Sequence, residues 1–129
     1  MGEIGRLAGP DFQVLAGSAS FLLPALSVGA VGGILALANI APVQCLEIWQ
    51  HFLDREWEEA RQMQMRMIPV NTAVTRRWGV PAVKAALDML GMYGGPVRPP
   101  LLPLSSEKKQ QLRNILHRAG ILSEGKVEG

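Results

Sequence analysis

FQVLAGSASFLLPALSVGAVGGILALAN, residues 12–39, is an uncharged stretch that glycine and proline divide into short apolar pieces. Residues 12–16 predict a short buried strand that ends at Gly17 and Ser18. Residues 18–26 predict a helix, because a serine can cap its start and proline is tolerated in a first turn. Residues 33–37 predict a second buried strand. The stretch is therefore predicted to form a strand–helix–strand unit.

The same stretch raises the alternative of a membrane span. No charged residue lies between Asp11 and Glu47, and a spanning helix needs only about 20 apolar residues. Against this alternative, Gly17, Pro24 and Gly29 interrupt the stretch at short intervals. The first residues also lack the positive segment with which a signal peptide begins. We therefore favour the strand–helix–strand unit and do not expect the membrane to be a partner.

Size and composition predict a globular chain of one domain at most. The 129 residues are 48% hydrophobic and 19% charged, with a formal net charge of only +2. Basic residues form scattered pairs, Arg76-Arg77 and Lys108-Lys109, separated by apolar sequence. A nucleic-acid interface concentrates such residues on one face, with aromatic residues between them. Nucleic acid is therefore not an expected partner.

Neither disulfide nor metal chemistry is predicted. Cys45 is the single cysteine, so no internal disulfide can form, and its apolar neighbours predict a buried thiol. His51 and His117 lie far apart in the sequence, without acidic or cysteine partners at the spacing of metal ligands. We expect no metal and no other cofactor.

The rest of the chain is predicted to be helical. A helix that begins at Pro42 is apolar over much of its circumference, so we expect it to be well buried. Asp54 is expected to cap a second helix, whose apolar stripe runs from Ala60 to Trp78 and which Pro69 should kink.

Glycine, proline and serine mark the boundaries of the later helices. Gly79 ends the second helix, and Pro81 fits the first turn of the next one. Residues 94–100 are rich in glycine and proline and predict an extended connector. Ser105 or Ser106 is expected to cap a last helix.

Two parallel strands are too few for a complete sheet, because both edges of the sheet stay unpaired. The pattern fits the end of a larger domain. FQVLAGS, residues 12–18, resembles the seventh strand of the (β/α)8 barrel in the dihydrodipicolinate synthase and N-acetylneuraminate lyase superfamily. Residues 29–39 resemble the eighth strand of that barrel. VTRRWGVP (74–81) and GMYGGPVR (91–98) most resemble the 4-hydroxy-2-oxoglutarate aldolase branch of these pyruvate-type class I aldolases.

The resemblance implies an α/β fold, the C-terminal fragment of a (β/α)8 TIM barrel, that is mostly α-helical in this chain. Residues 1–53 would be the end of the barrel, with its last two strands and flanking helices. Residues 54–122 would be the C-terminal helical extension, and residues 123–129 a flexible tail.

The resemblance also implies retro-aldol chemistry through a Schiff base, in which a lysine amine attacks the keto group of pyruvate or another 2-oxo acid. The lysine and relay tyrosine of the family lie on earlier strands, which have no counterpart in this sequence. Lys84 and Tyr93 match positions outside the barrel, so no catalytic residue is expected here. Gly17, Ser18 and Ile34 are the positions expected to bind the keto acid.

Three functions of different classes follow. The first is a truncated aldolase, inactive alone, whose full-length form cleaves 4-hydroxy-2-oxoglutarate to give pyruvate and is expected to be a homo-oligomer. The second is an assembly or regulatory module that pairs with a full-length or N-terminal homologue. The third is a small membrane protein. Whether this chain is itself an enzyme stays open, as does the choice between a cytoplasmic and a mitochondrial location.

Overall fold

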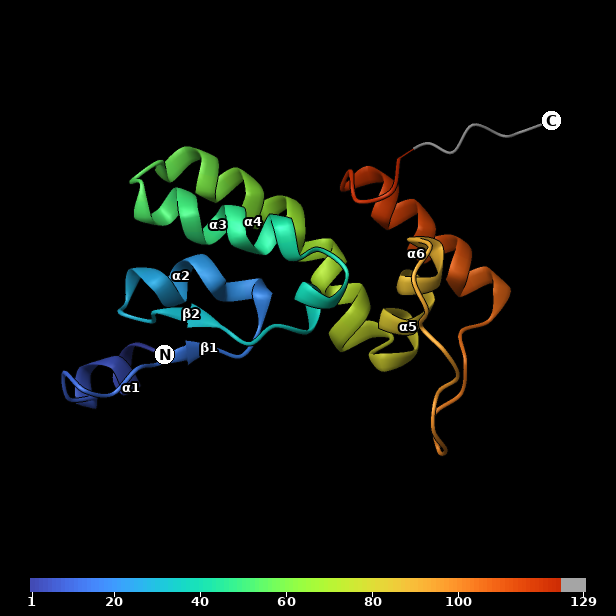
Figure 1. Cartoon of the computed structure of the whole chain (residues 1–129), viewed down its shortest axis with the longest axis horizontal. Helices are drawn as coiled ribbons and strands as arrows, with labels where there is room; N and C mark the ends of the chain where they lie inside the picture. Colours follow the sequence, from blue (N-terminus) through green and yellow to red (C-terminus); the bar gives the residue numbers. More distant parts are fainter. Residues whose placement is uncertain (124–129) are drawn as a thin grey trace.

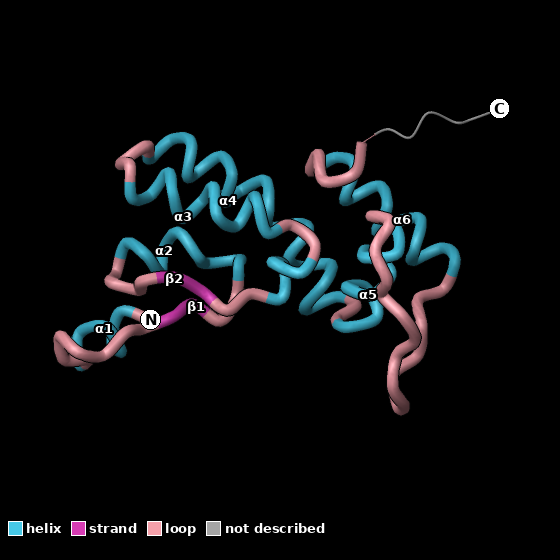
Figure 2. Tube along the Cα trace, in the orientation of Figure 1, coloured by secondary structure: helices cyan, strands magenta, loops and turns pink. Residues whose placement is uncertain are grey.

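The computed structural model describes residues 1–123 as a small parallel sheet with helices stacked mainly on one side of it and further helices beyond its end (Figures 1 and 2). The sheet, α1 and α2 lie at one end of the molecule with the α3–α4 pair, and α5 and α6 form the other end (Figure 1). The helices are α1 (Gly2–Leu7), α2 (Leu22–Ser27), α3 (Pro42–Leu53), α4 (Trp57–Thr72), α5 (Val80–Met89) and α6 (Ser106–Arg118). Within residues 1–123, no helix is both long enough and apolar enough to cross a membrane.

The sheet is shorter than the sequence predicts. β1 (Leu15–Ala16) and β2 (Gly32–Gly33) pair in parallel, joined by α2. The predicted strand–helix–strand order is therefore confirmed. The first strand occupies only the end of the predicted range.

The second strand is present at Gly32–Gly33, but its predicted extension to residue 37 is wrong. From Leu35 the chain enters a 3₁₀ turn, η2 (Ala36–Asn39), where backbone N–H groups donate to carbonyls three residues earlier. In this turn the backbone groups therefore bond to one another, whereas in a strand they would bond to a neighbouring strand. The turn also carries the side chain of Leu37 into the helical core, where it is fully buried.

The expectation that α3 is well buried is wrong for one of its faces. Cys45 and Ile48 are buried, as predicted for a helix against a core. Val43, Leu46 and Leu53, however, are all more than half exposed. α3 therefore presents an apolar face that residues 1–123 do not cover.

Asp54 does not cap α4, in contrast to the prediction. Its N–H donates to the Gln50 carbonyl at 2.9 Å, so that it closes the end of α3 instead. Arg55 then takes a φ of 62°, a left-handed conformation that commonly ends helices. Because the chain leaves the helical path at this point, α4 begins only at Trp57.

α4 supplies the centre of the core along the predicted stripe, where Ala60 and Met67 are fully buried. Pro69 lies inside α4 without ending it. The helix passes into a π-helical turn, η3 (Ala73–Arg77), and Gly79 with a φ of 62° separates this turn from α5. The predicted boundary at Gly79 is confirmed.

The C-terminal helices share this core. The Ser105 hydroxyl accepts a hydrogen bond from the Lys108 N–H at 3.3 Å, which confirms the predicted cap of α6. The Arg66 guanidinium on α4 donates to the Ala119 carbonyl at 2.6 Å and ties α4 to the end of α6. Buried apolar side chains form one cluster from Ala16 to Ala119. All but the first residue of the predicted tail, 123–129, lies outside the described residues.

Candidate functional site

Gly17 and Ile34 lie beside each other at the carboxyl ends of the two strands. The Ile34 N–H donates to the carbonyl of Ala16 at 2.9 Å, which holds the end of β2 next to Gly17. The side chain of Ile34 is 75% exposed. A Cβ added at Gly17 would meet no atom within 4 Å. The two residues therefore border open space at the end of the sheet where (β/α)8 enzymes hold their active sites.

Ser18 follows Gly17 but directs its hydroxyl into the protein. The hydroxyl oxygen accepts hydrogen bonds from the Ser20 N–H at 3.3 Å and from Asn71 Nδ2 at 3.2 Å. It also lies 3.0 Å from the Ser20 hydroxyl. The side chain of Ser18 thus caps η1 (Ala19–Phe21), and its carbonyl accepts from the Phe21 N–H at 3.4 Å, so neither group is directed at the open face.

No lysine of residues 1–123 lies at the strand ends. Lys84 is on α5, where its amine donates to a carbonyl of the connector at 2.9 Å. Lys108 and Lys109 are on α6, whereas Lys126 lies outside the described residues. Tyr93 is 85% exposed in the segment between α5 and the connector. In the described part of the chain, neither an amine nor a phenol is therefore placed to act at Gly17 and Ile34.

The residues that the structure describes also offer no candidate metal site. Residues 1–123 contain no group of three or more His, Cys, Asp or Glu side chains that could hold a metal ion.

An apolar groove with a volume of about 500 Å³ lies beside the strands. Leu15 and Val31 line it from the sheet, and Cys45, Leu46 and Trp49 line it from α3. Trp49 Nε1 donates to the Val31 carbonyl at 3.0 Å, so the indole leaves no free donor in the groove. None of the lining residues is charged. The groove therefore suits an apolar occupant.

Cys45 is predicted to react slowly while the chain is folded. Burial raises the pKa of its thiol from 9.0 to about 11, so the reactive thiolate is scarce at pH 8. The rate of reaction with a disulfide reagent, followed by absorbance, should rise at least about tenfold when guanidinium chloride unfolds the chain. Equal rates in the two states would contradict the burial of this thiol.

The raised pKa also fixes the direction of a pH effect on stability. The folded state keeps the Cys45 proton to a higher pH than the unfolded state does. The contribution of the Cys45 thiol to the free energy of unfolding is therefore fully present below pH 9, and it is lost as the pH rises towards 11.

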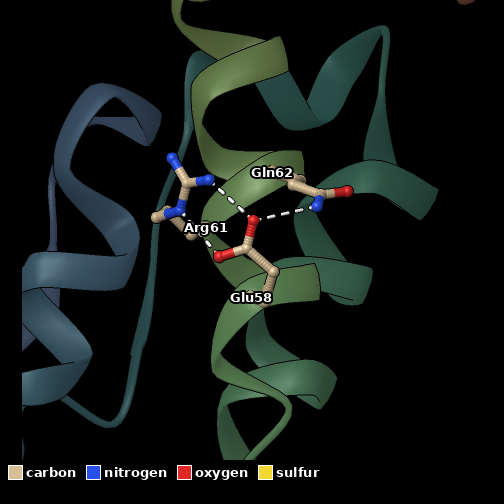
Figure 3. A network of polar contacts seen from close by, with 3 residues as sticks. All are labelled: Glu58, Arg61 and Gln62. Carbon is tan, nitrogen blue, oxygen red and sulfur yellow. Dashed lines mark hydrogen bonds and ion pairs between the residues drawn. The ribbon is translucent and has the colours of Figure 1, made fainter.

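A polar network of three side chains lies near the start of α4 (Figure 3). The Glu58 carboxylate accepts hydrogen bonds from Arg61 Nη2 at 2.6 Å and from Gln62 Nε2 at 2.9 Å. These bonds, chiefly the one from Arg61, lower the pKa of Glu58 to about 2. All three side chains are exposed, and an acid suits the start of a helix. The network therefore supports the beginning of α4 and is not a reactive site.

Comparison with known proteins decides the family. The sequence model that describes the dihydrodipicolinate synthetase family matches residues 1–119. The chain belongs to the dihydrodipicolinate synthetase family. A 4-hydroxy-tetrahydrodipicolinate synthase of Thermoanaerobacter sp. (strain X514) is 33% identical over 122 residues, which are 95% of this chain and 41% of the relative. The corresponding synthase of Methanopyrus kandleri is 36% identical over 89% of this chain and 38% of its own length.

Solved structures of the dihydrodipicolinate synthetase family share the fold. A dihydrodipicolinate synthase from Bacillus anthracis matches with a TM-score of 0.86 and 30% identity, over 91% of this chain and 40% of that structure. The enzyme from Cyanidioschyzon merolae matches with a TM-score of 0.84 and 31% identity, over 94% and 41%. The chain thus spans about two fifths of the length of these relatives. The expected superfamily is confirmed, whereas the narrower resemblance to 4-hydroxy-2-oxoglutarate aldolase stays a prediction.

Two buried amides near the strand ends were not predicted. Gln64 and Asn71 lie on α4 among the apolar residues of its stripe, and both are almost fully buried. Polar residues of an amphipathic helix ordinarily face the solvent, so the sequence pattern alone would place these two amides on the exposed side. Their spacing of two helical turns on the buried side was the signal available in the sequence.

Proposed function

We propose that this chain is the C-terminal part of a Schiff-base aldolase of the 4-hydroxy-2-oxoglutarate type. In the full-length enzyme, a homo-oligomer, this aldolase would release pyruvate from a 2-oxo acid. Residues 1–53 would complete the barrel and residues 54–122 would form its helical extension. The observation that carries the proposal is the juxtaposition of Gly17 and Ile34 at the carboxyl ends of parallel strands.

The three expected site residues would bind the keto acid and would not react with it. The missing Cβ of Gly17 lets a keto acid approach the backbone closely. Ile34 offers an exposed apolar wall beside it, and Ser18 would contribute its backbone N–H. The amine that attacks the keto group must come from another part of the fold, because the lysines of residues 1–123 lie on α5 and α6.

Borohydride trapping tests this division of roles. When the purified chain is incubated with pyruvate and sodium borohydride, we expect no pyruvate-dependent gain in mass by mass spectrometry. The physical reason is that an imine needs an amine with a lowered pKa at the site. A complete family enzyme serves as the positive control. A trapped adduct that persists in Lys84→Arg would point to another lysine, and any adduct on the chain contradicts the proposal.

A second candidate function is an assembly module, and the apolar groove favours it. β1 and β2 pair only with each other in the described residues, so β2 borders the groove with an unpaired edge. The exposed face of α3, with Val43, Leu46 and Leu53, continues this apolar surface. An uncharged groove beside a free strand edge suits an added strand with apolar side chains. The proposed occupant is the N-terminal part of a family homologue.

Mixing experiments test the module. The chain should form a complex of one-to-one mass by light scattering with the part of the Thermoanaerobacter synthase that it does not match. Leu46→Glu should weaken this complex at least about tenfold, because a carboxylate would lose its water in the groove. Leu102→Glu is the matched control, since Leu102 is 79% exposed between α5 and α6, outside the groove. If the mass is unchanged on mixing, no complex forms and the assembly-module function is contradicted.

The substrate can be tested on the same complex. The 4-hydroxy-2-oxoglutarate type rests on residues 74–81 and 91–98, which lie from η3 to α5 and in the connector. If the complex forms, release of pyruvate from 4-hydroxy-2-oxoglutarate would support the branch. A complex that forms a Schiff base with pyruvate but leaves 4-hydroxy-2-oxoglutarate intact would argue against it.

A further inference from the structure

Two buried amides of α4 reach the segment that follows β1. Gln64 is 4% exposed and Asn71 is 2% exposed, and they are the buried polar or charged residues of the described chain. Because they lie seven residues apart, they share one face of the helix. That face packs against η1, the turn directly after Gly17 and Ser18.

Gln64 binds the start of η1 and the first turn of α2 (Leu22–Ser27). Its Oε1 accepts a hydrogen bond from the Leu23 N–H at 2.9 Å, and its Nε2 donates to the Ala19 carbonyl at 2.8 Å. The first N–H groups of a helix have no partner inside the helix. One side chain therefore supplies the acceptor and the donor that a short η1–α2 segment lacks.

Asn71 binds the residue next to Gly17 but leaves half of its own amide unpaired. Nδ2 donates to the Ser18 hydroxyl at 3.2 Å. Oδ1 is fully buried and has no hydrogen-bond partner among the described residues. A buried acceptor without a partner destabilises a fold, and an apolar side chain of similar size would avoid that loss. Stability alone therefore does not account for an asparagine here.

We propose that Gln64 and Asn71 are positioning residues, which fix the turn that carries Gly17 and Ser18 at the carboxyl end of β1. This inference rests on the proposed function, because the turn matters for chemistry only if it borders a keto-acid site. Gln64 ties the start of η1 to the first turn of α2, and Asn71 sets the direction of the Ser18 side chain. The helical extension thereby determines the geometry at the end of the sheet.

Amide hydrogen exchange of the chain by NMR tests the inference without any keto acid. In Asn71→Leu, exchange of the Ser20 N–H, which donates to the Ser18 hydroxyl, should accelerate at least about tenfold. Amides in α6 should keep their rates, and the midpoint of thermal unfolding should not fall, because the unpaired acceptor is gone. Ser18→Ala removes the hydrogen bond between Asn71 and the Ser18 hydroxyl from the other side. It should accelerate hydrogen exchange of the neighbouring Phe21 N–H.

Matched variants separate positioning from general stability. Gln64→Leu should accelerate exchange of the Leu23 N–H, whereas Gln62→Leu, on the exposed side of the same helix, should not. Uniform acceleration together with a lower midpoint would overturn the inference, and so would unchanged exchange in both Asn71→Leu and Ser18→Ala. Pyruvate added afterwards tests the proposed function separately. If it leaves the Gly17 and Ile34 amide signals of the parent chain unshifted, the keto-acid site fails and the exchange rates still decide the positioning.

Discussion

Gly94→Ala is expected to lower the free energy of unfolding by about 3 kcal/mol or more. Gly94 is buried, and a Cβ at this position would overlap the carbonyl oxygen of Lys84 and lie 2.6 Å from its carbonyl carbon. These atoms belong to the backbone of α5, so they cannot move aside as a flexible side chain can.

Moving the connector away from α5 would not relieve this overlap without further loss. The Gly94 N–H donates to Asp88 Oδ1 at 2.8 Å, and its carbonyl accepts from Lys84 Nζ at 2.9 Å. Both bonds involve a charged group, and such bonds contribute about 1.5–3 kcal/mol each. Gly9→Ala is the control, because a Cβ at Gly9 meets no atom within 4 Å. Denaturant unfolding followed by circular dichroism measures both, and similar values for the two variants would refute the prediction.

Leu37→Ala is expected to destabilise the chain by about 2–5 kcal/mol. Leu37 is 0% exposed and sits on η2, which contacts α3, α4, α5 and η3. Truncation would leave a cavity where η2 meets these helices, and surrounding helices cannot collapse into it from several sides at once.

The control for Leu37→Ala is the same substitution at Leu46, which is 63% exposed. Leu46→Ala should change the stability of the isolated chain by less than about 0.5 kcal/mol. Because the buried residues form one cluster, thermal unfolding of Leu37→Ala should remain a single transition at a lower midpoint. Two separate transitions would mean that residues 1–53 and 54–122 unfold as independent domains.

Features set by neighbours in the sequence could be predicted. The Ser18 and Ser105 hydroxyls accept from N–H groups two and three residues later, and Gly79 needs only its own positive φ. Gly17 and Ile34 are a different case. Their place at the strand ends followed from the family resemblance, because composition and spacing alone make them a turn glycine and a core isoleucine.

Features that depend on distant partners could not be predicted. Gln64 bonds to residues 41 and 45 positions away, and no local pattern identifies those partners. The strand expected over residues 33–37 ends at Gly33 for the same reason, since Leu37 is drawn into a core built by helices later in the chain. The predicted cap at Asp54 failed for a local reason instead. The left-handed conformation of Arg55 delayed the start of α4 to Trp57.

The brevity of the parallel ladder has a consequence for the order of folding. β1 and β2 contribute only two residues each, and a loop must close before any bond between them forms. α3 and α4 are joined by residues 54–56 alone, so contacts at that end of the hairpin close only a short loop and can form early. We expect this hairpin to belong to the folding nucleus, with the strands joining after the transition state. The open face beside Gly17 would then be among the last parts of the chain to form and the first to be lost during unfolding.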